Sequence, residues 1–284
     1  MEDQNISMDQ ITKERLQRQR KIQIARTIFK PFLGKIQFQR FFEAFYGLSL
    51  LGLNFGTGDS VNHSGEICVL NYLQQKYKKN TDLIIFDVGA NVGDYTKSVL
   101  SFFDNAHIFC FEPSKTTFEQ LQKNVTKNEN VTLNNFGLGK ENKKAILFSN
   151  CQDLGLSSLY DRQLDHLGIK LSEREEVEIK KLDDYCSEKS LRNINLLKID
   201  VEGNELDVLC GANEMLSNKL IDFIQFEFGG CNIDSRTYFR DFFYLLGSNY
   251  QIYRILQNGL YSIKNYNEIN EVFITTNYLA QKKT

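Results

Sequence analysis

From Glu66 onward, short apolar runs alternate with longer amphipathic segments, and this alternation predicts an α/β protein. Apolar runs typical of buried strands lie at residues 83–88, 107–111, 131–136, 195–199 and 223–226. Apolar side chains recur at helical spacing in residues 66–77, 95–103, 115–127, 205–216 and 237–246. Because strands that alternate with helices are joined by right-handed crossovers, we expect a doubly wound, mostly parallel sheet covered on both faces.

Two regions depart from this alternation. Residues 145–148 and 176–181 have the pattern of strands without a useful helix between them, which predicts an inserted antiparallel excursion. The C-terminal part contains three further strand-like runs, at 251–255, 260–263 and 272–275. A terminal hairpin built from them must add at least one antiparallel strand to the sheet.

The N-terminal part has a different charge pattern. Residues 12–42 contain nine Lys or Arg and one acid, Glu14, a charge of about +8, so a net charge of −2 leaves about −10 on the remainder. Apolar residues are interleaved with the basic ones, which predicts one or two amphipathic basic helices interrupted near Pro31 and Gly34. A Gly-rich stretch at 52–66 separates this part from the rest. We therefore expect a helical extension at 1–65 and a main domain at 66–284.

The basic segment 12–42 has two interpretations. It could pack on the main domain or on a second subunit, which would make the protein a homo-oligomer, and this interpretation is the favoured one. Alternatively, it could be a surface that contacts anionic lipid or a membrane-bound glycan precursor.

Composition excludes several other classes of protein. The six cysteines form no C-x-x-C pair and the three histidines are isolated, so neither a disulfide framework nor a zinc site is expected. No apolar run reaches the eighteen or so residues of a membrane span, and the N-terminus lacks the apolar core of a signal peptide. We expect a cytoplasmic protein, free or peripheral to the membrane. Because the main domain is acidic, no nucleic-acid partner is expected.

The sequence IIFDVGANVGDYTKS, residues 84–98, predicts a ligand-binding turn after the first strand of the sheet. Gly89 and Gly93 permit a tight turn whose backbone amides face a ligand. The pattern is D-x-G-x-x-x-G, with Asn91 in the middle, and it differs from the G-x-G-x-x-G of dinucleotide sites. Asp87 would repel a pyrophosphate and would suit a cationic ligand, such as a sulfonium with an attached amino acid.

An acid at the end of the second predicted strand supports the same ligand. Glu112 follows Gly93 by nineteen residues, where a carboxylate can accept hydrogen bonds from both hydroxyls of a ribose. The alternative is that Glu112 is an acid favoured by the N-terminus of the next helix. Taken together, the glycine turn and Glu112 predict an adenosine-type ligand.

Several further segments carry a resemblance to a known family. They include FDVGANVGDYT (86–96), FEPS (111–114), NNFGLG (134–139), SSLYDR (157–162), LDDYC (182–186), LLKIDVEGNELDVLCGA (196–212) and IQFEF (224–228). With these segments the chain resembles the FkbM family of S-adenosylmethionine-dependent methyltransferases from about residue 66 to 276. The D-V-E-G-x-E segment is the most specific to that family.

The resemblance implies a class I methyltransferase fold, a Rossmann-like sheet of seven strands that ends in an antiparallel hairpin. It implies S-adenosylmethionine as the cofactor and a hydroxyl of a sugar, glycan or small metabolite as the acceptor. Transferred position by position, it implies a methyl-donor loop, a ribose-binding acid, an adenine contact and an acid at the reacting centre. These are, in order, Asp87, Gly89, Asn91 and Gly93; Glu112; Phe136 and Gly137; and Asp200.

Carboxylates at neighbouring strand ends are the candidates for proton transfer. A sugar hydroxyl is a poor nucleophile, and a base that takes its proton contributes about 10²–10⁴-fold to the rate. Asp200 is the favoured candidate for this base. Asp200, Glu202 and Glu227 are expected close together, where mutual repulsion raises the pKa of at least one. A Mg²⁺ ion held by Asp200 and Glu227 could acidify the hydroxyl instead. Glu202 could also simply hold the turn, as Glu205 is expected to favour its helix N-terminus.

The sequence leaves two more features and two other functions undecided. Lys198 could be a counter-charge for these acids or an ordinary edge residue. Residues 157–162 could contact the acceptor or form a solvated loop. The alternative functions are a methyltransferase that acts on nucleic acid or protein, and a non-catalytic binding module that keeps the fold. The acidic main domain argues against the first, and the complete set of strand-end carboxylates argues against the second.

Overall fold

The computed structural model describes residues 8–56, 64–77, 81–125, 128–150 and 153–284. The chain divides into two compact units, Met1–Gly52 and Leu53–Thr284. The sequence predicts a helical extension at 1–65 and a methyltransferase domain at 66–284. This functional division stays a prediction.

The first unit is helical, as the sequence predicts. It consists of α1 (Met8–Phe29), the short 3-10 helix η1 (Ile36–Phe38) and α2 (Gln39–Gly52). The helices are interrupted at Pro31, which has no N–H to donate, and at Gly34, whose φ of 69° lies in the left-handed region. The predicted interruption near these two residues is therefore confirmed.

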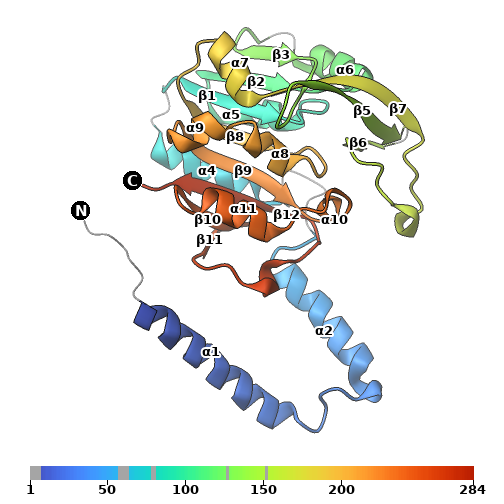
Figure 1. Ribbon diagram of the computed structural model, residues 1–284, viewed down its shortest axis with the longest axis vertical. Helices are drawn as coiled ribbons and strands as arrows, with labels where there is room; N and C mark the ends of the chain where they lie inside the picture. The colour runs from blue at the N-terminus through green and yellow to red at the C-terminus, as the bar shows by residue number, and fades with distance from the viewer. Residues whose placement is uncertain (1–7, 57–63, 78–80, 126–127, 151–152) are drawn as a thin grey trace. The chain divides into compact units, whose positions relative to one another are not determined.

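The second unit is built on a sheet of eight strands in the order β11-β10-β12-β9-β8-β1-β2-β3 (Figure 1). The five strands from β9 to β3 are parallel, and the other three are antiparallel. The strands are β1 (Leu83–Val88), β2 (Ala106–Phe111), β3 (Val131–Asn134), β8 (Ile194–Ile199), β9 (Ile221–Phe228), β10 (Tyr250–Leu256), β11 (Gly259–Ile263) and β12 (Thr276–Lys282). The sheet has one strand more than the seven expected, because the terminal hairpin places β11 at its edge.

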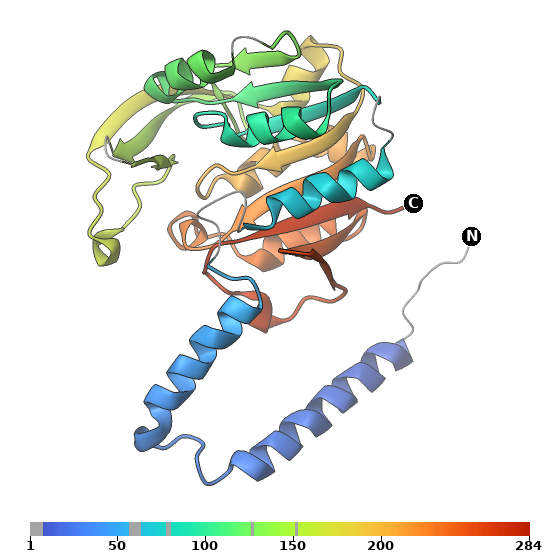
Figure 2. The same ribbon diagram turned by 180° about the vertical axis from the view of Figure 1, so that it is seen from behind.

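Helices cover both faces of this sheet, which confirms the doubly wound α/β fold. One face carries α4 (Glu66–Lys76), α5 (Asp94–Phe102) and α6 (Lys115–Val125) (Figure 2). The other carries α7 (Leu182–Glu188), α8 (Glu205–Cys210), α9 (Asn213–Ser217) and α11 (Phe239–Leu246) (Figure 1). Each face has its own core of buried apolar side chains. The short α10 (Cys231–Ser235) follows β9.

The predicted excursion forms a second, smaller sheet in the order β4-β7-β5-β6. Its strands are β4 (Gly137–Leu138), β5 (Lys143–Asn150), β6 (Asp153–Ser158) and β7 (Glu173–Lys180), and the 3-10 helix η2 (Asp165–Leu167) lies between the last two. The pairing of β5 with β7 is antiparallel, as expected. The single strand predicted at 131–136 is divided, because β3 ends at Asn134 and Gly137 pairs with Ile179 of the second sheet.

Two predicted elements are wrong in position or continuity. The last strand is Thr276–Lys282 and not 272–275, because it must lie between β9 and β10 and pair with both. The apolar run before it instead packs Phe273 against Phe228, with ring centroids 5.4 Å apart. The helix predicted at 205–216 is interrupted after Cys210. There Gly211 passes so close to the backbone of Gly139 that a Cβ would lie 2.0 Å from the Gly139 carbonyl oxygen.

Candidate active site

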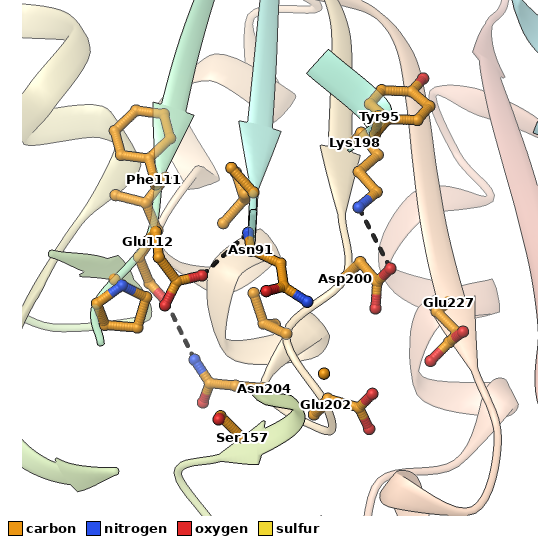
Figure 3. A pocket seen from close by; sticks show the side chains of 18 of the residues that line it. Asn91, Tyr95, Phe111, Glu112, Ser157, Lys198, Asp200, Glu202, Asn204 and Glu227 are labelled. Carbon is orange, nitrogen blue, oxygen red and sulfur yellow. Dashed lines mark hydrogen bonds and ion pairs between the residues drawn. The ribbon is translucent and has the colours of Figure 1, made fainter. Parts of the chain in front are cut away.

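The main cavity of the second unit lies at the carboxyl ends of the central strands. The chain runs from β1 to β2 and β3 on one side, and then places β8 on the other side of β1, so the strand order reverses beside β1. Ligands of open α/β sheets bind at such a point. The cavity has a volume of about 670 Å³, within the range of small-molecule sites. Residues that line it include Gly89, Asn91, Glu112, Gly137, Ser157, Asp200, Glu202 and Glu227 (Figure 3).

The turn after β1 requires glycine at both predicted positions. Gly89 has a φ of 79°, and a Cβ there would lie 1.8 Å from the carbonyl oxygen of Asp200. Gly93 has a φ of 91°, and a Cβ there would meet the Leu121 side chain at 2.8 Å. Gly89 and Asn91 line the cavity, whereas Gly93 is not among its lining residues and is the N-cap of α5.

The amides of this turn are already engaged within the protein. The N–H groups of Gly89 and Ala90 both donate to the carbonyl oxygen of Phe111, at 3.0 and 3.1 Å. The N–H of Asn91 donates to the Glu112 carboxylate at 3.0 Å. The turn therefore offers a ligand close backbone approach and the Asn91 side chain. The expectation that these three amides themselves face the ligand is not met.

A buried polar row lies beneath the turn, on the face of the sheet that α4 and α5 cover. In the strand register Asp87 stands beside Lys198, and Lys198 stands beside Gln225. Thr96 donates to the Asp87 carboxylate at 2.7 Å, and the Lys198 ammonium lies 3.6 Å from it. Asp87 is fully buried and is not among the lining residues of the cavity. A direct contact between Asp87 and a cationic ligand is therefore not provided by this arrangement.

Lys198 is the counter-charge that the sequence left undecided. Its ammonium lies 3.2 Å from the Asp200 carboxylate and over the ring of Tyr95, 5.2 Å from the centroid. Burial alone would lower the pKa of Lys198, but the neighbouring carboxylates, Asp200 foremost, raise it above its ordinary value. Lys198 thus links Asp87 under the turn to Asp200 at the cavity.

Glu112 lies where the sequence places it, directly after β2. One carboxylate oxygen accepts from the N–H of Asn91, and the other accepts from the N–H of Ser114 at 2.9 Å. Burial raises the pKa of Glu112 to about 7, although both hydrogen bonds act in the opposite direction. Each oxygen of a carboxylate can accept a further hydrogen bond, and the side chain lines the cavity (Figure 3). Glu112 can therefore receive two hydroxyl groups of a ligand.

Of the two residues expected near an adenine, Gly137 lines the cavity and Phe136 does not. A Cβ at Gly137 would lie 2.8 Å from the Ile179 side chain and 3.6 Å from Pro113. The ring of Phe136 packs against Phe111, with centroids 5.7 Å apart, and under the ammonium of Lys180 at 4.5 Å.

Asp200 and Glu227 lie at the tips of β8 and β9, on the other side of Asn91 from Glu112 (Figure 3). Asp200 is paired with Lys198, and its side chain is 36% exposed. Glu227 is only 7% exposed and has no hydrogen-bond or ion-pair partner among the described residues. Burial, followed by the charges of Asp200 and Glu202, raises the pKa of Glu227 well above its ordinary value. The ionised form of Glu227 is therefore a stronger base than an ordinary carboxylate.

Glu202 connects the strand tips to the second sheet. Its φ of 53° is unusual for a residue with a side chain. Its carboxylate accepts from the guanidinium of Arg162, which also lies 3.7 Å from Asp234 of α10. The Ser158 hydroxyl donates to the Glu202 carbonyl oxygen at 2.6 Å. Burial and the Asp200 charge raise the pKa of Glu202 to about 8, and Arg162 opposes them.

These contacts give residues 157–162 a defined place. Ser157 lines the cavity, whereas Ser158 and Arg162 hold the Glu202 turn. The solvated-loop alternative is therefore wrong for Ser158 and Arg162, whereas a contact of residues 157–162 with the acceptor stays a prediction.

The candidate metal ligands that lie close together differ from the expected pair, Asp200 and Glu227. Glu202, Glu227 and Cys231 are the group within the described ranges whose ligand atoms all lie within 4.8 Å of one another. Asp200 is not part of it. A thiol suits softer cations than Mg²⁺, and Arg162 already neutralises Glu202. A Mg²⁺ ion held by Asp200 and Glu227 stays an alternative to a carboxylate base, which this cluster does not test.

Two further glutamates complete the surroundings of the cavity. Glu205 accepts from the N–H groups of Val201 and Gly203, at 3.1 and 3.0 Å, and so holds the turn before α8, close to the structural role expected for it. Glu66 lines the cavity and accepts from the Gln225 side chain at 2.9 Å. Sequence reasoning missed Glu66, because it belongs to α4 and only the packing of α4 on the sheet brings it to the site.

The profile of the methyltransferase FkbM domain matches residues 87–261, more than half of the chain. The protein belongs to this family of S-adenosylmethionine-dependent methyltransferases. Methyltransferase 1 of Beauveria bassiana is 32% identical over 148 residues, which cover 47% of this chain and 59% of that protein. The 2-O-methyltransferase NoeI of Sinorhizobium fredii is 28% identical over 145 residues, 48% of this chain and 60% of that protein. This FkbM protein thus spans about three fifths of the length of these curated relatives.

The solved structures that match this chain by structural comparison have low sequence identity to it. Precorrin-6y C5,15-methyltransferase from Geobacter metallireducens is 12% identical, with a TM-score of 0.40 over 76% of this chain and 88% of that one. SMU.1697c from Streptococcus mutans, determined in complex with SAH, is 9% identical, with a TM-score of 0.43 over 77% and 98%. Likeness at this level supports no inference about function.

Proposed function

We propose that this FkbM protein transfers a methyl group from S-adenosylmethionine to a hydroxyl of a sugar, glycan or small metabolite. The observation that carries the proposal is the cavity in which Glu112 lies on one side and Glu227, which has no partner among the described residues, lies on the other. Asn91 and Asp200 lie between them (Figure 3). Family membership supplies the class of reaction. The relative named as a 2-O-methyltransferase supports a hydroxyl acceptor.

The donor would occupy the part of the cavity next to β1 and β2. Glu112 would accept hydrogen bonds from both ribose hydroxyls, because each of its oxygens has a free acceptor position. Gly89 and Asn91 would allow the donor close to the backbone of the turn. Gly137 would leave room for the adenine, whereas Phe136 would act behind it through Phe111. Asp87 would act through Lys198 and Thr96, by holding the turn from beneath.

The acceptor would lie at the tips of β8 and β9. As the bond between the acceptor oxygen and the methyl carbon forms, the bond between that carbon and the donor sulfur breaks, and the hydroxyl must lose its proton. Glu227 would take this proton in its ionised form, because a carboxylate whose pKa is raised by burial is a stronger base than an ordinary one. Asp200, held by Lys198, would orient the hydroxyl. Glu202 would keep the second sheet attached through Arg162.

Donor binding and methyl transfer test the proposal directly. Calorimetry should show binding of S-adenosylmethionine to the folded protein at micromolar to low millimolar ligand. Methyl transfer from labelled donor should then appear on a carbohydrate or metabolite fraction, with the methylated oxygen located by mass spectrometry. If the folded protein bound no donor at millimolar concentration, the proposed function would be wrong.

Donor affinity should depend on pH through Glu112. The pKa of Glu112 is about 7 in the free protein, so the carboxyl group is protonated below that pH and ionised above it. Ribose hydroxyls donate to the ionised form, and we therefore expect the Kd of S-adenosylmethionine to rise by up to about tenfold per pH unit below 7 and to level off above it. Calorimetry across this range measures the effect.

The variant Glu112→Gln is the control for this dependence. It cannot ionise, so it should bind the donor more weakly with a Kd that changes little with pH. A wild-type Kd that stays constant through the same pH range would show that Glu112 does not receive the ribose.

Metal chelation should change the rate little. Arg162 already provides a positive charge at Glu202, and burial raises the pKa of the Cys231 thiol, which keeps it protonated. We expect methyl transfer in the presence of EDTA to stay within about twofold of the untreated rate. If EDTA abolished methyl transfer and added Mn²⁺ or Mg²⁺ restored it, this expectation would be wrong. A metal ion, and not Glu227, would then activate the acceptor hydroxyl.

A further inference from the structure

The first unit contains a long basic stretch, residues 15–42, and its acids lie outside this stretch, at Glu2, Asp3, Asp9, Glu14 and Glu43. Between Arg15 and Phe42 the sequence contains eight Lys or Arg and neither Asp nor Glu. Among the described side chains of this stretch, the basic ones are exposed: Arg20, Lys21, Arg26, Lys30, Lys35 and Arg40. A charge of this density attracts an anionic surface.

The same unit exposes large apolar side chains around the connection between α1 and α2. Ile36 is 89% exposed, and Phe29, Phe32, Leu33, Phe41 and Phe45 are between 42% and 60% exposed. Among the side chains of Met1–Gly52 that the structure describes, at residue 16 and residues 20–52, Leu50 alone is buried. Two helices and a short connection do not bury these side chains against one another, so the unit has an apolar surface that needs a partner.

The partner must accept apolar side chains and positive charge at the same place. A second copy would provide apolar contacts, but it would bring two segments of the same charge together, which opposes association. A nucleic acid would neutralise the charge, but phosphate contacts leave aliphatic side chains such as Ile36 and Leu33 in water. The surface of an anionic bilayer provides negative headgroups beside an apolar layer.

We propose that the segment from Phe29 to Phe45 binds the surface of an anionic membrane. Lys30, Lys35 and Arg40 contact the headgroups, while Phe32, Ile36 and the neighbouring aromatic side chains enter the boundary of the acyl layer. Because no described helix is both long enough and apolar enough to cross a membrane, the segment lies in the interface. This inference goes beyond methyl transfer and does not depend on it.

Sedimentation of the full chain with vesicles tests the proposal. We expect the protein to bind vesicles of three parts phosphatidylcholine and one part phosphatidylglycerol, to bind pure phosphatidylcholine much more weakly, and to dissociate at high salt. Each basic side chain near an anionic surface contributes about fivefold to partitioning. The triple variant Lys30→Gln, Lys35→Gln, Arg40→Gln should therefore bind roughly a hundredfold more weakly. The double variant Phe32→Ser, Ile36→Ser, which keeps the charge, should lose about tenfold or more.

A matched variant separates local binding from net charge. Lys143→Gln, Lys144→Gln, Lys264→Gln removes the same charge from exposed positions of the second unit and should stay within about twofold of wild type. Circular dichroism should show that all variants are folded. Equal loss of binding in this variant and in the Lys30, Lys35 and Arg40 variant would overturn the proposal. So would vesicle-independent dimerisation that the Phe32 and Ile36 variant abolishes, or binding to RNA without binding to vesicles.

Discussion

The substitution Glu227→Gln is expected to lower kcat for methyl transfer by about 10²–10⁴-fold, with the Kd of S-adenosylmethionine nearly unchanged. Glutamine keeps the volume of the side chain but cannot accept the proton of the acceptor hydroxyl. Because Glu227 has no partner among the described side chains, its replacement breaks no hydrogen bond that holds the fold. Single-turnover transfer from labelled donor measures the rate, and calorimetry measures the affinity.

The stability of the same variant distinguishes loss of a base from damage to the fold. The pKa of Glu227 is raised in the folded protein, so the stabilising effect of its bound proton is present below the unfolded pKa and is lost as the pH rises through the folded pKa. Glutamine stays neutral, so the variant should have a higher Tm than wild type at about pH 8 and a similar Tm near pH 4. Glu188→Gln, at an exposed position at the end of α7, should change neither quantity. A kcat within threefold of wild type would show that Glu227 is not the base.

The buried strands could be located from the sequence, whereas the bounds of the last strand could not. The apolar runs of β1 and β8 are buried on both faces of the sheet, so burial alone predicts them. The last strand is different, because Thr276–Lys282 contains polar residues and is fixed by its pairing with β9 and β10. Tertiary contacts that no local pattern encodes decided its position.

The candidate site shows the same division. Glu112, Asp200 and Glu227 were found because each follows or ends an apolar run, and parallel strands bring their ends to one edge. The side chain of Asp87 lies beneath the turn because the strand register places it beside Lys198, on the face that α5 covers. The contacts of Glu202 with Arg162 depend on the second sheet, whose packing the sequence does not reveal.

The substitution Gly89→Ala is expected to lower the Tm by more than about 10 °C and to abolish donor binding. Two effects act at this position. The φ of 79° disfavours any side chain, and the new Cβ would lie 1.8 Å from the carbonyl oxygen of Asp200. To relieve that overlap, the turn must move away from the tip of β8, and this movement would break the hydrogen bond from Asn91 to Glu112.

Gly168→Ala is the matched control, because it isolates the backbone effect from the overlap. Gly168 has a φ of 70°, and nothing lies within 4 Å of the position that its Cβ would take. The control variant should therefore lose only about 1 kcal/mol, or about 2–4 °C in Tm, and should bind the donor as wild type does. Thermal unfolding and calorimetry of both variants measure the difference. If both lost the same stability, the close approach of the β1 turn to Asp200 would not be what requires glycine at residue 89.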